Sequence, residues 1–166
     1  MDLKGTRQMN VLVLCVGRLK EKYWTEACGE YLKRLSRYGK CQVTEVDDLP
    51  EPRGASPADQ KKVMDREAEL LLKHIAPSDQ VICLCIRAPQ TDSPGLAETI
   101  RLGDMAGRRQ VFVIGGSLGL GEAVLARADR RLSMSDMTFP HQLARVMLLE
   151  QLYRAAKILS GERYHK

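Results

Sequence analysis

The sequence predicts an α/β protein: a five-stranded, mostly parallel sheet with helices on both of its faces. Short apolar runs alternate along the chain with longer stretches of helical periodicity, which is the pattern of layered α/β domains. Two of the runs, residues 81–86 and 111–114, are apolar throughout, as strands covered on both faces must be. A length of 166 residues with 44% hydrophobic content suits one domain. We expect that domain to span residues 9–166, after a loose or disordered N-terminal extension at 1–8.

The expected elements alternate strictly, beginning with a strand and ending with the longest helix. In order, they are strand 11–16, helix 24–35, strand 41–46, helix 56–75, strand 81–86, helix 93–105, strand 111–114, helix 122–128, strand 131–134 and helix 141–159. Each strand is a short run rich in apolar residues, and the longer helices place apolar side chains three or four residues apart.

Helix boundaries follow from capping residues, prolines and glycines. Gly39 is expected to end the first helix. Ser56-Pro57 and Ser93-Pro94 each place a capping hydroxyl before a proline at the first helical position, so helices should begin there. Between the second strand and second helix, two prolines and a glycine predict one long irregular loop.

A binding site is expected at the loops that follow Ile86, Ile114 and Met134. Ligands of open parallel sheets bind beyond the carboxyl ends of the strands. The second of these loops, residues 115–121, contains four glycines, which allow positive φ angles or close approach of the backbone to a ligand. Its glycine spacing matches neither the dinucleotide nor the phosphate-loop pattern. A tight strand-to-helix turn explains the glycines equally well.

The last helix suggests a homodimer. Twelve of the seventeen residues at 143–159 are apolar, so this helix must be buried on more than one side, and a second subunit would provide the cover. Arg145 is the lone cation on the apolar side and needs an anion there. A carboxylate, including one across the dimer, and a bound phosphate or carboxylate ligand both satisfy it. His141 lies one turn earlier on the same side, where it lines a site or caps the helix.

Charge and cysteine content narrow the class of protein further. The 26 Lys and Arg residues outnumber 21 Asp and Glu, and the net charge of +5 fits either a nucleic-acid partner or a solvated basic surface. Arg18, Lys20 and Lys22 directly follow a strand and can hold phosphates.

Five cysteines without a CxxC spacing indicate reduced thiols, a cytoplasmic location and no metal site. No apolar stretch reaches the length of a membrane span.

Several motifs together resemble the ribosomal RNA large subunit methyltransferase H family of the SPOUT superfamily. They are VLVLCVGRLKEKYW at 11–24, VFVIGGSLGL at 111–120, MTFPHQ at 137–142, YRA at 153–155 and the ending RYHK at 163–166. The resemblance covers residues 9–166 in order. It implies a SPOUT-type trefoil knot, an obligate homodimer and S-adenosyl-L-methionine as methyl donor. The implied target is N3 of a pseudouridine in helix 69 of 23S rRNA, on the assembled ribosome, with no DNA partner.

The resemblance also implies site residues. The expected cofactor-binding residues are Leu84, Gly115, Gly116, Met134, Ser135, Asp136, Met137, Thr138 and Phe139. The expected catalytic residues are His141, Arg145, Tyr164 and His165. In this hypothesis, an imidazole orients or deprotonates the target base, while Arg145 or a cation of the tail binds an RNA phosphate or the donor carboxylate. Leu118 departs from the family, whose members often have a polar or acidic residue there. Two alternatives stay open: a SPOUT methyltransferase of another RNA, such as tRNA, and a ribosome-binding module without catalysis.

Overall fold

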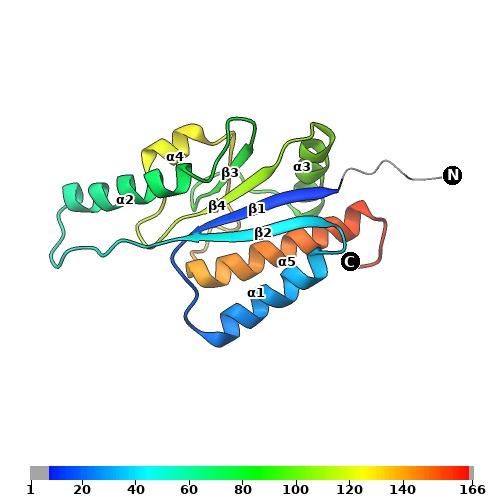
Figure 1. Ribbon diagram of the computed structural model, residues 1–166, viewed down its shortest axis with the longest axis horizontal. Coiled ribbons are helices and arrows are strands. Elements are labelled where there is room, and N and C mark those ends of the chain that lie inside the picture. The colour runs from blue at the N-terminus through cyan, green and yellow to red at the C-terminus, as the bar shows by residue number, and fades with distance from the viewer. Residues whose placement is uncertain (1–7, 165–166) are drawn as a thin grey trace.

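A parallel five-stranded sheet forms the centre of the computed structural model, which describes residues 8–164 (Figure 1). Its elements are β1 (Met9–Val16), α1 (Lys22–Leu35), β2 (Gly39–Val46), α2 (Pro57–Leu72), β3 (Gln80–Leu84), α3 (Ser93–Met105), β4 (Gln110–Ile114), α4 (Glu122–Arg127), β5 (Arg130–Leu132) and α5 (His141–Leu159). The predicted alternation of strands and helices is confirmed. Residues 1–7 of the expected extension, and His165 of the expected site, lie outside the described residues.

The strand order is β2-β1-β4-β3-β5, and every pair of neighbours is parallel. Helices α1, α3 and α5 cover one face, whereas α2 and α4 cover the other, so the prediction of helices on both faces is confirmed (Figure 1). The central strand β4 is buried along its whole length. Strand order and register alone do not define how the chain threads, so the trefoil knot stays a prediction.

Several boundaries differ from those expected: β3 ends at Leu84 instead of Ile86, and β5 ends at Leu132 instead of Met134. Three further differences concern the predicted signals at helix ends. Helix α1 ends at Leu35, and Gly39 instead opens β2 with a φ of +147°, because a side chain there would collide with the backbone of Met9. Helix α2 begins as predicted, with a capping box between Ser56 and Asp59, but it ends at Leu72 instead of residue 75. The cap of α3 is Asp92, whose carboxylate accepts the Gly95 N–H, instead of Ser93.

The apolar surface of α5 is largely covered within the chain. The helix lies between α1 and α3 and against the sheet, and it buries Leu148, Leu149 and Leu152 completely or almost so. A helix in the middle of a three-helix layer has neighbours on both flanks, so its extensive apolar surface does not require a second subunit. The homodimer therefore stays a prediction that this pattern does not support by itself.

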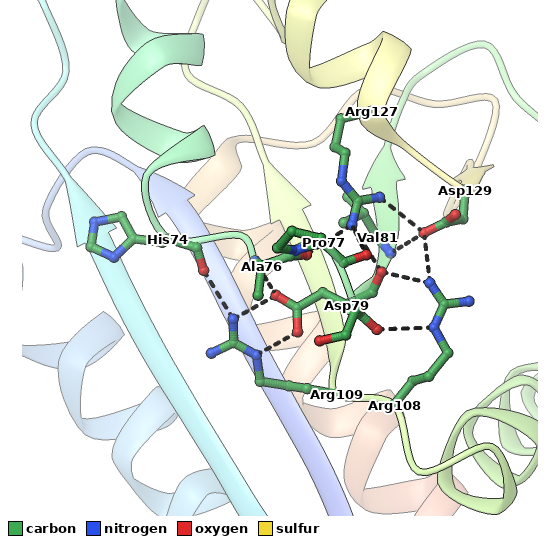
Figure 2. Close-up of polar contacts among 10 residues, drawn as sticks. His74, Ala76, Pro77, Asp79, Val81, Arg108, Arg109, Arg127 and Asp129 are labelled. Atoms are coloured by element: carbon green, nitrogen blue, oxygen red, sulfur yellow. Dashed lines mark hydrogen bonds and ion pairs between the residues drawn. The ribbon is translucent and has the colours of Figure 1, made fainter.

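A network of arginines joins the loops at the amino edge of the sheet (Figure 2). Arg109 donates two hydrogen bonds to the Asp79 carboxylate, at 3.0 and 2.6 Å, and Asp79 is only 3% exposed. Arg108 and Arg127 both donate to the Asp79 carbonyl, and Arg127 also bonds Asp129. Burial alone would raise the pKa of the Asp79 carboxyl, but the hydrogen bonds from Arg109 and Ala76 and the nearby positive charges lower it below its ordinary value.

All five cysteines are free thiols, and Cys15, Cys28 and Cys83 are buried. Burial raises the pKa of Cys15, Cys41 and Cys83 to about 12, so these thiols stay protonated at neutral pH. Within residues 8–164, no helix is long and apolar enough to cross a membrane.

Candidate active site

A cleft of about 800 Å³ opens at the carboxyl edge of the sheet. It is lined by the loops that follow β3, β4 and β5 and by the start of α5, so the three predicted loops do meet at one place. The cause is the parallel arrangement, which brings the carboxyl ends of neighbouring strands to the same edge. The expected cofactor-binding residues that line it are Leu84, Gly115, Gly116, Met134, Ser135, Met137, Thr138 and Phe139.

The glycine loop forms one wall of the cleft as a closed turn. Gly119 has a φ of +88°, and its N–H donates to the Gly116 carbonyl at 3.1 Å. A Cβ on Gly115 would lie 2.8 Å from the carbonyl carbon of Gly119, so no side chain fits there. The loop is thus a tight turn that also lines the cleft with its backbone. Both interpretations of the glycines, a tight turn and a backbone surface for a ligand, are therefore compatible with the structure. Leu118 adds an aliphatic side chain to this wall.

Hydrogen bonds tie the loop after β5 to the loop after β3. The Ser133 hydroxyl donates to the Ile86 carbonyl at 2.9 Å, and the Ser133 N–H donates to the Pro89 carbonyl at 3.0 Å. Asp136 is the expected cofactor residue that does not line the cleft, and its carboxylate accepts a hydrogen bond from Gln90 at 2.9 Å. The two loops therefore form one connected wall.

His141 is the first residue of α5 and lines the cleft. It does not cap the helix, because Pro140 occupies the N-cap position. Burial and the positive charge of Arg145 lower the pKa of the imidazole below its ordinary value, although Asp48 opposes them. His141 is therefore neutral near pH 7 and can accept a proton from a bound ligand.

Arg145 lies behind this site instead of lining it. Its side chain is 2% exposed and donates to Glu45 at 2.6 Å and to the Gly17 carbonyl at 3.1 Å. Glu45 also accepts the Leu19 N–H. The anion that Arg145 needs is thus a carboxylate of the same chain, so neither a ligand nor a second subunit is required to balance its charge. The pair fixes the turn after β1 against the start of α5.

Tyr164 lies far from the cleft of its own chain. Its hydroxyl donates to Glu150 at 3.2 Å, and its ring packs edge-on against Tyr153 at 4.9 Å between centroids. Glu150 comes nine residues after His141 on α5, about 13 Å along the helix axis. The structure therefore does not bring Tyr164 together with the other expected catalytic residues of this chain.

The basic residues after β1 do not line the cleft either. Arg18 pairs with Asp47 at 3.0 Å, and Lys22 lies 3.5 Å from Glu26, in both cases with exposed side chains. Exposed pairs of this kind stabilise a fold little and exchange partners easily. Their contact with RNA phosphates stays a prediction.

Sequence reasoning missed Glu67 of α2. Its side chain is only 7% exposed, and one carboxylate oxygen lies 3.2 Å from the position that a Cβ on Gly116 would take. Burial raises the pKa of Glu67, and the nearby charge of Asp48 raises it further, against a hydrogen bond from the Leu49 backbone. One signal was available: Glu67 lies four residues from both Val63 and Leu71 on the apolar stripe of its helix.

Known methyltransferases are similar to this chain in sequence over nearly its whole length. A family model described as a predicted SPOUT methyltransferase matches residues 9–165. The chain is 47% identical over 95% of its length to Ribosomal RNA large subunit methyltransferase H of Carboxydothermus hydrogenoformans, and the match covers 100% of that protein. It is 50% identical over 94% of its length to the protein of the same name from Pelotomaculum thermopropionicum, with 98% of that protein covered.

Solved structures share the fold at low sequence identity. A probable methyltransferase from Bordetella pertussis superposes with a TM-score of 0.58 at 15% identity, covering 89% of this chain and 95% of that one. A putative methylase family protein from Neisseria gonorrhoeae gives a TM-score of 0.55 at 13% identity, covering 92% and 85%. These likenesses extend over nearly the whole sheet and its helices.

Proposed function

The chain belongs to the ribosomal RNA large subunit methyltransferase H family of SPOUT methyltransferases, and from this premise we propose that it methylates N3 of a pseudouridine in helix 69 of 23S rRNA on the assembled ribosome. The methyl donor in this proposal is S-adenosyl-L-methionine. The name of the full-length relatives, ribosomal RNA large subunit methyltransferase H, supports large-subunit rRNA as the substrate. Such a substrate implies that the protein acts in the cytoplasm.

The observation that carries the proposal is the cleft with its glycine wall. A volume of about 800 Å³ suits a ligand of the donor's size. A Cβ on Gly115 would collide with Gly119, so the loop packs closely on itself, and its glycines line the cleft with backbone. Apolar side chains from Leu84, Met134 and Phe139 offer contacts to an adenine ring, while backbone groups of both loops offer hydrogen bonds. The residues present therefore fit the donor.

In the proposed reaction, the protein's own residues position the base and remove its proton. The donor supplies an already activated methyl group, so alignment and loss of the N3 proton are the remaining tasks. His141 lines the cleft with a neutral imidazole and would accept that proton at its free ring nitrogen. The Glu45–Arg145 pair would hold the turn at Gly17 and the start of α5, and so act as a positioning pair.

A homodimer belongs to the same proposal. Tyr164 lies away from its own cleft, so a catalytic role for the tail requires the tail of a second subunit. Arg145 cannot take over the role of the tail in binding a ligand, because its charge is already balanced by Glu45. Sedimentation of the pure protein measures whether the dimer forms.

The proposal is tested by single-turnover methylation of assembled ribosomes that lack the modification, followed by mass mapping of the 23S rRNA. We expect one added methyl group on the helix 69 fragment and none elsewhere. A methyl group on tRNA would instead support the transfer RNA alternative. Calorimetry that detects no binding of S-adenosyl-L-methionine would refute the enzyme and leave a ribosome-binding module.

A further inference from the structure

Two arginines line the cleft and have no ion-pair or hydrogen-bond partner for their side chains among the described residues. Arg87 lies on the loop after β3, and Arg131 lies in β5; both are exposed. Within residues 8–164, neither guanidinium has an ion pair or a side-chain hydrogen bond, and neither belongs to the residues with further contacts. An arginine side chain carries five N–H donors and a permanent charge, so these groups are free to bind an anion.

The described lining of the cleft holds no carboxylate to balance them. It contains Arg87, Arg131 and the neutral His141, but no Asp or Glu. Nearby acids are engaged elsewhere: Asp136 accepts from Gln90, and Glu67 packs behind Gly116 with a backbone hydrogen bond to its carboxylate. The cleft is therefore electropositive at neutral pH.

The backbone under both arginines is held in place. In the β3–β5 register, Arg131 lies opposite Cys83, and the Cys85 N–H donates to the Leu132 carbonyl at 2.9 Å. The residue before Arg87 is fixed by the Ser133 hydroxyl, which donates to the Ile86 carbonyl. Two arginines on one connected wall are better organised to bind an anion than two on independent loops.

We propose that Arg87 and Arg131 form a phosphate clamp at the mouth of the cleft, which binds the RNA backbone beside the target nucleotide. This inference rests on the proposed function, because it names how the same site takes its RNA. The donor is a poor candidate for the anion: it carries a sulfonium, an ammonium and one carboxylate, so its net charge is positive. RNA presents a phosphate at each nucleotide, and planar guanidinium groups bind phosphates with two parallel hydrogen bonds.

The test measures binding to unmodified ribosomes over a series of salt concentrations for the wild type, Arg87→Gln, Arg131→Gln and the double variant. Affinity decreases as salt increases, so the slope of log affinity against log salt is negative. We expect this slope to become shallower by about 0.7 to 0.9 for each phosphate contact removed. Calorimetry with S-adenosyl-L-methionine should give the same affinity for all four proteins. Arg66→Gln is the matched control, because Arg66 is exposed on α2 and does not line the cleft.

The possible outcomes separate the clamp from the enzyme. An unchanged salt slope in the double variant overturns the clamp, and an unchanged slope with weakened donor binding assigns the anion to the donor carboxylate instead. A decrease in the slope for Arg66→Gln equal to that for the cleft variants also overturns it. A wild type that binds ribosomes but transfers no methyl group refutes the proposed function, while the slopes still decide whether the two arginines bind phosphate.

Discussion

The amino edge of the sheet uses arginine to hold loops together, whereas the carboxyl edge leaves arginines open to a cleft. At the amino edge, Arg108, Arg109 and Arg127 bond aspartates and loop carbonyls (Figure 2). At the carboxyl edge, Arg87 and Arg131 face the cleft with no such partner in the described chain. An arginine therefore joins loops where an acid or a carbonyl lies within its reach, as Arg145 also does beside Glu45 and Gly17, whereas Arg87 and Arg131 have no such group near them in the described chain.

The loops at the two edges are also held by different means. Side chains join the loops at the amino edge. The Asp79 carboxylate, for example, accepts hydrogen bonds both from the Ala76 N–H of its own loop and from Arg109 before β4. At the carboxyl edge, the glycine loop closes through its backbone, with the bond between Gly119 and Gly116, although Ser133 and Glu45 hold its neighbouring loops through side chains. A loop that holds itself through its backbone leaves its side chains and its surface available to a ligand. Substitutions at the amino edge should thus affect stability, and those at the carboxyl edge should affect binding and rate.

The largest effect is expected for His141→Gln. Removal of the proton acceptor should lower the single-turnover rate about a hundredfold. The pKa of His141 lies below its ordinary value, so the wild-type rate should be constant above about pH 6.5 and fall as the imidazole becomes protonated below it. The variant should lack this acid limb. His74→Gln, an exposed histidine at the amino edge, is the control and should keep the wild-type profile. A variant with the wild-type rate and acid limb would exclude His141 as the base.

Asp79→Ala should cause the next largest effect, a loss of about 2 kcal/mol in the free energy of unfolding. It removes the acceptor of the Ala76 N–H and leaves Arg109 with the His74 carbonyl, and the partly exposed Arg109 limits the cost by turning to water. Urea unfolding measures the loss, and donor affinity should not change. Glu98→Ala, which breaks an exposed pair with Arg101, should cost much less, because water replaces the lost contact. Equal losses in the two variants would contradict a structural role for the amino-edge network.

The effect of Asp79 should depend on pH in a defined direction. Its pKa is lower in the folded protein than in the unfolded chain, so its contribution is complete above about pH 4 and is lost as the pH falls through the folded value. The difference in stability between the wild type and Asp79→Asn should therefore shrink in acid. A difference that stays constant down to pH values well below 4 would show that the charge of Asp79 is not what stabilises the loops.

Gly115→Ala should have the smallest effect, on binding. The added Cβ would collide with the backbone of Gly119, so the turn must open, and we expect about a tenfold loss of donor affinity, or about 1.4 kcal/mol. The unfolding free energy should change less than in Asp79→Ala. Gly29→Ala is the matched control, because nothing lies within 4 Å of its added Cβ and alanine favours the helix. Unchanged donor affinity in Gly115→Ala would separate the glycine loop from the donor site.

Local signals in the sequence were accurate where local forces decide the structure. The start of α2 at Ser56 was predicted because its capping hydroxyl and Pro57 are adjacent in the chain, and the structure adds Asp59, three residues on, as the partner in a capping box. The three loops of the cleft were predicted because a parallel sheet must bring its carboxyl ends together. The predicted cap of α3 was wrong by one residue, since Asp92 and Ser93 are both good caps and the Ser93 hydroxyl instead bonds Gln151 of α5.

From the sequence alone follow the alternation of strands and helices, the position of the cleft and the resemblance to a methyltransferase family. Only the folded chain decides the strand order, the pairing of Arg145 with Glu45 across 100 residues, and the placement of Glu67 behind Gly116. Periodicity and capping depend on residues a few positions apart, so they can be recognised in the sequence. Which acid lies beside which arginine depends on packing between distant segments, and that decides which arginines stay free to bind a ligand.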